Sequence, residues 1–316
     1  MDDKTTNYVS VRVSTLRGDQ KLSFDLYIQI GDRHILYVRQ GDSFAGERLL
    51  RLQQKKLRKM FILPEHEEKY REYLTRNIEQ AYDKTSSQTL ENRAQVIQGL
   101  QQASTEAVFE NPADAESYKQ AKEGAERFAD FLMREDKALK SLLSVANADQ
   151  SLSHHGVTVS SLALTVAKKV GYSDPKNLSL LTLGALLHDI EHHRSGLPVA
   201  QVLGNLTPEQ KEIYLAHPKA GSDLIKDLNH IDKQVAVIIL EHEELIDGSG
   251  FPGKKLEKDL NPMSVLVSTA NAYDRMVSFE GMTPSAAIKS LMIDKLGLHP
   301  LGQLNALKAI VSENKL

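Results

Sequence analysis

The sequence predicts a small α+β module at the N-terminus, followed by a long all-α part that forms a helical bundle. Within residues 8–39 apolar and polar residues alternate, and a period of two is typical of half-buried strands. From about residue 150 onward the apolar residues recur with a helical period, and segments rich in Gly, Pro and Asp interrupt them. These two patterns separate a β-containing part of the chain from a helical part.

Residues 1–85 form the predicted α+β module. Apolar stretches within residues 8–39 predict three strands of a small antiparallel sheet, the last of them at "HILYV" (34–38). A helical period begins at "GERLLRLQQKKLRKM", "FILPE" (61–65) interrupts it, and Pro64 begins another helix. Residues 1–145 contain no glycine-rich phosphate loop and no metal-ligand pattern. A sensory or interaction role and a purely structural role both fit this module.

Residues 86–149 are predicted to be a helical connector. The stretch from about 86 to 140 is charged and rich in glutamine, and "ENPADAES" (110–117) marks a break in it. Its apolar spacing is too irregular for a coiled coil, which leaves open a simple connector or a dimerising helical pair. Residues 150–316 form the predicted all-α bundle.

The composition excludes several classes of partner and site. With 316 residues and 41% hydrophobic content, the chain can form a core in each of two domains. The formal net charge of -3 provides no basic field for long nucleic acid and no polybasic patch for a membrane. Because cysteine is absent, a metal ion would need His, Asp, Glu or Asn ligands, which favour harder first-row ions. The lack of a signal peptide and of a long apolar stretch predicts a cytoplasmic protein.

Histidines cluster in the predicted bundle. Eight of the eleven histidines lie between residues 154 and 242, including those of "LLTLGALLHDIEHHRSG" (181–197). A single histidine in a bundle is more often a surface residue or a hydrogen-bonded core residue than a ligand. A group spread over different helices can instead converge in the bundle core. The candidates for such a group are His155, His188, Asp189, His217 and His242.

Four motifs of the helical part resemble the HD-GYP domain, a branch of the HD phosphohydrolase superfamily. "HHGVTVSSLALTVAKKVG", "LGALLHDIEHH", "HPKAGSDLI" and "HEELIDGSGFP" follow the motifs of that domain in order and at similar spacing. The resemblance covers about residues 150–312, and the chain is a divergent member because it has GFP in place of GYP. The resemblance implies an HD-type helical bundle that holds two or three iron or manganese ions and hydrolyses cyclic di-GMP.

The resemblance also implies roles for individual residues. His155 matches the family's first histidine ligand, His188 and Asp189 match the HD pair, and His217 and His242 match later ligands. Asp189 would bridge two divalent ions, and a hydroxide shared by those ions would attack the phosphodiester. The expected cofactor is therefore a pair of divalent metal ions, iron in the first place and manganese as the alternative.

Three departures from the family pattern affect the metal ligands. Glu243 stands where the family has the second histidine of a doublet, and Asn271 stands where it has an aspartate ligand. Both side chains can still donate an oxygen atom to a hard metal ion, and the two exchanges together preserve the charge of the ligand shell. Ser151 stands where some members have the carboxylate that holds a third metal, so no third metal is expected.

Other departures affect the substrate side. His192 replaces a lysine that can contact phosphate, and Phe251 replaces the tyrosine of GYP. The basic segment expected after "TANAYDR" is absent. The expected catalytic residues are Asp189 and His192, and the expected substrate-binding residues are His192, Gly250, Phe251 and Lys254. In the competing structural interpretation, His188 and His192 form a simple metal pair or a solvated edge, "DGSGFPGKK" is an ordinary tight turn and Lys254 is solvated.

Two classes of function follow from these observations. The first is a metal-dependent hydrolase of bacterial signalling that converts cyclic di-GMP to a linear product. The second is a metal-bound signalling module that has little or no catalytic activity and binds a cyclic dinucleotide or a protein partner such as a diguanylate cyclase. Another HD phosphohydrolase activity on a different phosphoester is a third alternative, and a homodimer remains open. Neither long nucleic acid nor a membrane is an expected partner.

Overall fold

The computed structural model describes residues 7–44, 47–55, 57–146, 151–197 and 203–315. Contacts between Cα atoms divide the chain into two compact units, Met1–Ala103 and Ser104–Leu316. The first unit holds a four-stranded sheet and the second is helical, which confirms the predicted α+β module followed by an all-α bundle. The finer division into segments 1–85, 86–149 and 150–316 stays a prediction.

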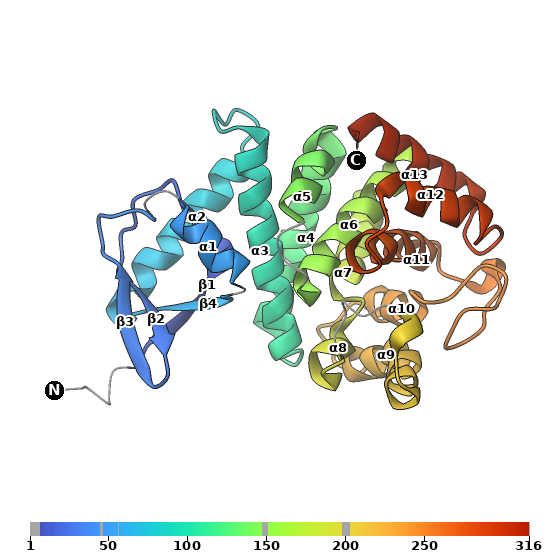
Figure 1. The fold of residues 1–316 in the computed structure, drawn as a ribbon, viewed down its shortest axis with the longest axis horizontal. Coiled ribbons are helices and arrows are strands. Elements are labelled where there is room, and N and C mark those ends of the chain that lie inside the picture. The colour runs from blue at the N-terminus through green and yellow to red at the C-terminus, as the bar shows by residue number, and fades with distance from the viewer. Residues whose placement is uncertain (1–6, 45–46, 56, 147–150, 198–202, 316) are drawn as a thin grey trace. The chain divides into compact units, whose positions relative to one another are not determined.

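The first unit contains an antiparallel sheet with the strand order β1-β4-β2-β3 (Figure 1). Its strands are β1 (Val9–Arg12), β2 (Leu26–Ile30), β3 (Arg33–Val38) and β4 (Lys59–Ile62). The sequence predicts three strands but not β4, because only Met60 and Ile62 of this short segment are buried apolar residues. Since β4 pairs with both β1 and β2, tertiary packing rather than local pattern decides its conformation.

Two α-helices accompany the sheet of the first unit. They are α1 (Arg48–Gln54) and α2 (Glu67–Tyr82), and a short 3₁₀ helix that begins at Pro64 leads into α2. Residues from the strands, the loops, α1 and α2 form one hydrophobic core, whose most buried members are Phe24, Leu26, Phe44, Met60 and Ile62.

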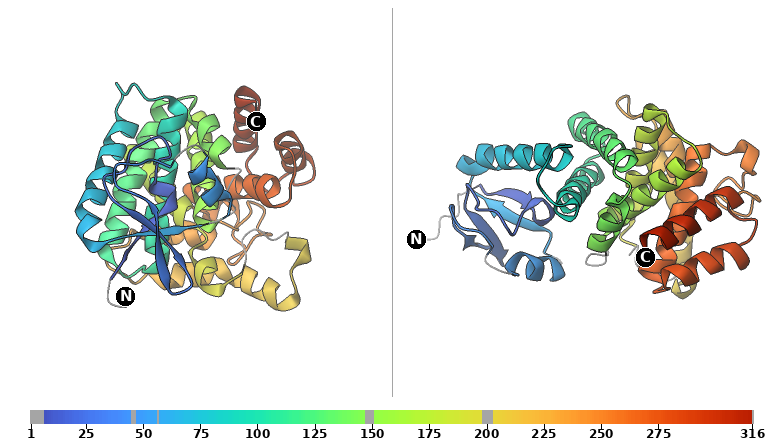
Figure 2. Two further views of the ribbon diagram at one scale, coloured as in Figure 1. Left: turned by 60° about the vertical axis from the view of Figure 1, so that its left-hand side comes forward. Right: turned by 90° about the horizontal axis from the view of Figure 1, so that it is seen from above.

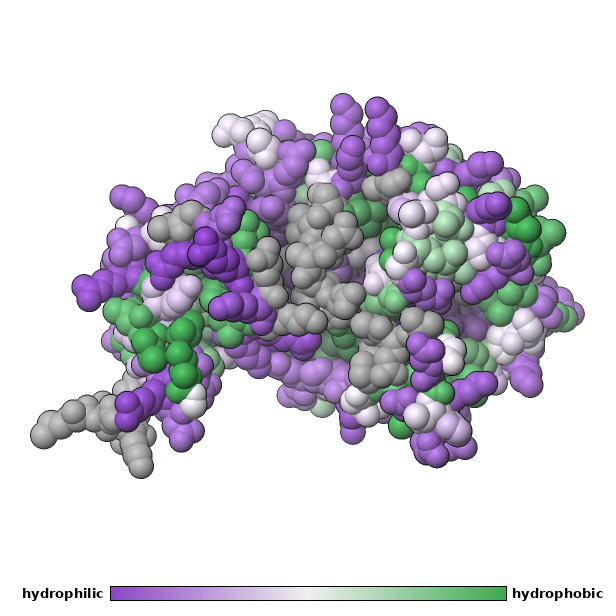
Figure 3. Space-filling view, in the orientation of Figure 1, coloured by the Kyte–Doolittle hydropathy of each residue, from purple (hydrophilic) through white to green (hydrophobic). Residues whose placement is uncertain are grey.

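The hairpin of β2 and β3 exposes apolar side chains. Ile30, Ile35 and Leu36 are 59%, 46% and 38% exposed, and Figure 3 shows an apolar patch on this part of the first unit. The strand β3 lies at an edge of the sheet, and an exposed apolar edge strand favours pairing with another chain. The interaction role that the sequence leaves open for this unit is compatible with this surface.

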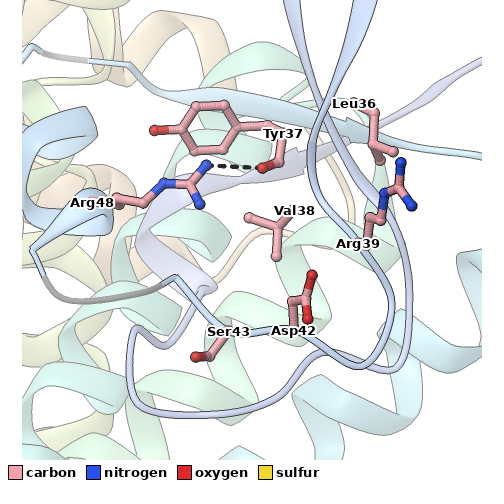
Figure 4. Close-up of a pocket in the computed structure, with 7 residues that line it drawn as sticks. All are labelled: Leu36, Tyr37, Val38, Arg39, Asp42, Ser43 and Arg48. Atoms are coloured by element: carbon pink, nitrogen blue, oxygen red, sulfur yellow. Dashed lines mark hydrogen bonds between the residues drawn. The ribbon is translucent and has the colours of Figure 1, made fainter.

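A cavity of about 550 Å³ lies beside the end of β3 (Figure 4). Arg48 reaches into its wall and donates a hydrogen bond of 2.9 Å to the carbonyl oxygen of Tyr37. Two arginines, Arg39 and Arg48, and one aspartate, Asp42, carry the charges of the lining. These residues do not identify a ligand, so the sensory role of this unit stays a prediction.

The helix α3 (Leu90–Glu110) begins in the first unit and ends in the second, where α4 (Ala115–Arg134) and α5 (Ala138–Ala146) follow. The break expected at residues 110–117 lies between α3 and α4. There the side chain of Asp114 accepts hydrogen bonds from the backbone N–H groups of Glu116 and Ser117. These contacts satisfy two donors at the N-terminus of α4.

The remaining helices form the bundle, in which α6 packs against α7 and α11, and α7 packs against α4 and α10 (Figure 1). The helices α12 and α13 lie side by side at the C-terminal end (Figure 2). Among the described residues, no helix is long and apolar enough to cross a membrane. The bounds are α6 (Leu152–Lys169), α7 (Pro175–Leu187), α8 (Ile190–Ser195), α9 (Pro208–Ile225), α10 (Lys233–Glu241), α11 (Pro262–Asp274), α12 (Pro284–Ile293) and α13 (Leu301–Asn314).

Two glycines allow the central helices to approach closely. A Cβ atom at Gly156 on α6 would lie 2.6 Å from the carbonyl oxygen of Leu186 on α7. A Cβ atom at Gly184 on α7 would lie 2.5 Å from the Cδ1 atom of Ile238 on α10. Each distance is far below van der Waals contact, so α6, α7 and α10 can reach their observed separation only with glycine at these positions.

We expect the substitution Gly156→Ala to destabilise the protein by about 1–3 kcal/mol, because the added methyl group must displace the backbone of α7. Gly302→Ala on α13 is the matched control, since a Cβ atom there meets no other atom within 4 Å, and its effect should stay below about 1 kcal/mol. Urea denaturation in the presence of a chelator measures both changes. Equal stability of the two variants would contradict the close helix contact.

Candidate metal centre

Side chains from four different parts of the bundle converge on one buried site. His155 lies near the start of α6, and His188 and Asp189 lie between α7 and α8. His217 lies within α9, and His242 directly follows α10. All five residues are at most 3% exposed. The convergence expected from the sequence is therefore present in the structure.

Hydrogen bonds from Nδ1 fix the orientation of all four imidazole rings. In three of them Nδ1 donates to a backbone carbonyl oxygen three residues earlier in the chain, whereas Nδ1 of His155 donates to Asp274 Oδ2 at 2.6 Å. The three backbone pairs are His188 with Ala185, His217 with Tyr214 and His242 with Ile239. Because Nδ1 carries the proton, each Nε2 atom presents a lone pair to the centre of the site, as a metal ligand must.

The carboxylate of Asp189 lies between two pairs of imidazoles. Its Oδ2 atom is 3.3 Å from His188 Nε2 and 3.6 Å from His155 Nε2. Its Oδ1 atom is 3.2 Å from His217 Nε2 and 3.4 Å from His242 Nε2. The result is two groups of three ligand atoms that share Asp189, each compact enough to hold one metal ion.

The polar contacts within the site are incomplete without cations. Both oxygen atoms of Asp189 are buried and accept no hydrogen bond. The Nε2 atoms of His155 and His188 are 3.2 Å apart, and those of His217 and His242 are 2.9 Å apart. When the rings are neutral their proton lies on Nδ1, so each of these pairs brings two nitrogen lone pairs together. A divalent cation in each group would remove both defects, so the residues fit a pair of metal ions.

The two oxygen donors expected from the sequence also lie at this site. The Oδ1 atom of Asn271 is 3.1 Å from Nε2 of His155, beside the first group. The Oε1 atom of Glu243 is 4.0 Å from Nε2 of His242, beside the second group. Asn271 Nδ2 and the hydroxyl of Tyr214 both donate to Glu243 Oε1, at 3.2 and 2.7 Å. One additional oxygen atom is thus available next to each pair of imidazoles.

The electrostatics keep the carboxylates of the site ionised. Burial opposes ionisation of Asp189, but the neighbouring imidazoles of His188 and His192 hold its pKa well below the usual value. Burial also opposes ionisation of Glu243, yet His242, His217 and the charge of Arg275 lower its pKa. Both side chains are therefore in the form that binds cations.

His192 packs against the second group. Its ring stacks on that of His217 with 4.3 Å between centroids, and its Nε2 atom is 3.9 Å from Asp189 Oδ1. Burial lowers the pKa of His192 to about 3. At neutral pH this side chain is uncharged, so it cannot contribute the positive charge of the lysine that it replaces.

The loop after α10 brings Phe251, but not Lys254, to the site. The Phe251 ring lies edge-on to the rings of Tyr214 and His217, with centroids 5.7 and 6.3 Å away. A Cβ atom at Gly250 would lie 2.3 Å from the backbone nitrogen of Leu245, which gives this glycine a packing role. Lys254 is exposed at the surface of the loop.

Four residues of the site were not predicted from the sequence. Asp274 orients His155, Tyr214 binds Glu243, and Arg275 lies over the ring of Tyr214. Glu244 is buried, and its carboxylate accepts hydrogen bonds from the backbone N–H groups of Gly253 and Lys255, which holds the loop in place. The segment "TANAYDR" contains two of the four, and the helical spacing of Tyr214 from His217 could have indicated a third.

Comparisons with known proteins identify the family and the fold of this chain. A family model described as HD domain matches residues 138–295. The solved structure of Bd1817, an HDG"Y"P protein from Bdellovibrio bacteriovorus, is 50% identical and has a TM-score of 0.91. That alignment covers 97% of this chain and 100% of the other chain. The matched domain is therefore supported both by sequence and by fold.

Curated relatives match over part of their length. A cyclic di-GMP phosphodiesterase from Pseudomonas aeruginosa is 24% identical over 196 residues, which cover 56% of this chain and 47% of the relative. A cyclic di-GMP phosphodiesterase from Thermotoga maritima is 31% identical over 163 residues, which cover 51% of this chain and 43% of the relative. The chain thus spans less than half the length of these two relatives.

We expect His192 to make the metal-free protein less stable in acid. Between the ordinary histidine pKa of 6.5 and the value of about 3 in the folded protein, the unfolded chain binds a proton that the folded chain does not. The free energy of unfolding therefore falls as the pH decreases through this range, by at most about 1.4 kcal/mol per pH unit for one such group.

His192→Gln should flatten this pH dependence, whereas His193→Gln, at the exposed neighbouring position, should leave it unchanged. Denaturation of chelator-treated protein between pH 6.5 and 4 measures the slope. An unchanged slope in His192→Gln would contradict the assignment of a neutral, buried His192.

Proposed function

This chain belongs to the HD domain family and, within it, to the HD-GYP proteins, and on that basis we propose that it is a two-metal phosphodiesterase that hydrolyses cyclic di-GMP to a linear product. One observation carries the proposal. The buried carboxylate of Asp189, whose oxygens accept no hydrogen bond, is shared by two groups of metal-ligand atoms. Such a shared carboxylate is the arrangement expected at a binuclear site that acts on phosphate esters.

Each residue of the proposed centre has a distinct task. His155 and His188 would hold one cation, His217 and His242 the other, and Asp189 would bridge the two. When bound, the pair of divalent cations supplies positive charge that activates water and stabilises the transition state of phosphodiester hydrolysis. Asn271 and Glu243 would complete the two ligand sets with one oxygen atom each. Iron is the metal we propose, with manganese as the alternative, because nitrogen and oxygen ligands suit both ions.

The surrounding residues orient these ligands and exclude water. The Nδ1 hydrogen bonds hold each ring in one orientation, so that binding a cation requires little rearrangement. The uncharged ring of His192 packs against His217, and the Phe251 ring packs on the same residue from the loop. These contacts lower the local dielectric, which strengthens the attraction between the ligands, the cations and an anionic substrate.

A second function is favoured by a different observation. His192 is uncharged and Lys254 is exposed, so two residues expected to contact the substrate lack a charge directed at the site. This supports a metal-bound signalling module that binds a cyclic dinucleotide, or a protein such as a diguanylate cyclase, with little or no hydrolysis. Calorimetry combined with product analysis separates the two functions, because only the enzyme converts bound cyclic di-GMP.

We expect full-length protein reconstituted anaerobically with iron or manganese to convert cyclic di-GMP to its linear product. Asp189→Asn should lower turnover by about 100-fold or more and reduce the metal content from two ions per chain, because both groups lose a shared anionic ligand. Asp223→Asn on the exposed face of α9 is the control and should retain metal and activity. Absence of turnover with two ions bound would exclude the enzyme and leave the signalling module.

We also expect Glu243 to act as a ligand of the second metal ion. Glu243→Ala should lower the occupancy of one of two sites, and Glu243→His should restore it, since imidazole can take over the ligand role. Glu212→Ala, at an exposed position on α9, should have no effect. Metal analysis after dialysis measures the occupancy. Two ions per chain at full affinity in Glu243→Ala would remove Glu243 from the ligand set.

A further inference from the structure

Arg275 carries a buried positive charge at the edge of the metal centre. Its guanidinium carbon lies 5.4 Å from the ring centroid of Tyr214 and 5.4 Å from that of Phe279. The residue is only 7% exposed. Two aromatic rings thus restrict the position of the guanidinium, and a planar set of N–H donors suits two oxygen atoms of one anion.

The two aromatic rings next to Arg275 each contact a residue of one ligand group. It begins a π-helix, Arg275–Phe279, that directly follows α11, and π-helical segments are frequent at functional sites. Phe279, at the other end of this segment, packs against the ring of His155 with centroids 5.1 Å apart. Tyr214, the other ring near the guanidinium, is hydrogen-bonded to Glu243. Arg275 thus lies beside residues of the first and of the second group.

The charge of Arg275 acts on the centre itself. It contributes to lowering the pKa of Glu243 and of His192. Burial disfavours the charged guanidinium, but Tyr214, Glu243 and Asp189 raise the pKa of Arg275, so it remains protonated. The guanidinium is therefore a permanent cation within electrostatic reach of the proposed metal ions.

The charges of the loaded site leave room for an anion. Asp189, Glu243, Glu244 and Asp274 supply four negative charges, whereas two divalent cations and Arg275 would supply five positive charges. The remaining positive charge is buried, and buried charge is costly unless an opposite charge neutralises it. A phosphate group is an anion of suitable charge and geometry for a guanidinium beside two cations.

Other basic residues of the site region are unsuited to this task. His192 is uncharged at neutral pH, and Lys254 is exposed on the loop. Lys255 donates a hydrogen bond of 2.6 Å to the buried carboxylate of Glu241, which engages its ammonium group in holding the loop. Arg275 differs from all three because its charge is buried and permanent and acts on Glu243 and Asp189 of the centre.

We infer that Arg275 is a phosphate-binding residue, whose guanidinium contacts the non-bridging oxygens of the phosphodiester that occupies the metal centre. The inference rests on the proposed function for the identity of the substrate, but the same contact would bind inorganic phosphate. The positively charged residue that would contact the phosphate thus lies outside the four sequence motifs. The guanidinium would act together with the two cations on one phosphate group.

Calorimetric titration of the metal-loaded full chain with inorganic phosphate and with cyclic di-GMP tests the inference. Arg275→Met should weaken the binding of phosphate by about 10-fold or more while two metal ions per chain remain bound. Arg275→Lys should bind with intermediate affinity, because lysine keeps the charge but loses the bidentate geometry. The exposed Arg194, on the nearby helix α8, provides the control Arg194→Met, which should bind as tightly as the wild type.

The outcomes separate the inference from the proposed function. If phosphate affinity depends on Arg275 while the wild type does not hydrolyse cyclic di-GMP, the phosphate contact stands and the phosphodiesterase fails. If the wild type hydrolyses cyclic di-GMP and Arg275→Met has the same phosphate affinity and the same KM, Arg275 is only a counter-ion and the inference is overturned. Should Arg275→Met fail to fold, Arg275→Lys decides, because unchanged phosphate affinity in that variant would equally overturn the inference.

Discussion

The buried carboxylate of Asp189 is the interaction on which the rest of the helical unit depends. Four imidazole nitrogen atoms lie within 3.6 Å of its two oxygens, and no hydrogen bond satisfies either oxygen. A polar group so placed in an apolar bundle would destabilise the fold by several kcal/mol unless cations neutralise it. We therefore expect metal binding and stability of this unit to be coupled, since ions that bind only the folded chain stabilise it by mass action.

The helices and the loop around Asp189 hold the nitrogen and oxygen atoms of the ligand side chains close together. Glycines at positions 156 and 184 let three helices approach until the ligand side chains meet. Backbone carbonyl oxygens and Asp274 then fix the imidazole rings. Glu244 holds the loop that places Phe251 over the ligands. Close packing, ring orientation and loop geometry thus act on the same few atoms, and a change in any of them alters the others.

The sequence predicts the centre better than it predicts the surroundings. His155, His188, Asp189, His217 and His242 stand out because buried imidazoles on separate helices need a reason, and the structure brings them together. The strand β4 escapes prediction because its four residues acquire their conformation from pairing with two neighbours. Arg275 escapes for a similar reason, because it begins a π-helix, whose side-chain directions do not follow the α-helical period. Local patterns therefore identify the ligands, while the groups that orient or complement them depend on tertiary structure.

We propose that the carboxylate of Asp189 bridges two metal ions. Anomalous diffraction from crystals of the iron-loaded protein, recorded on both sides of the iron absorption edge, locates the ions directly. We expect two anomalous peaks, one beside Oδ2 of Asp189 with His155 and His188, the other beside Oδ1 with His217 and His242. A single peak, or two peaks of which one does not contact Asp189, would contradict the account.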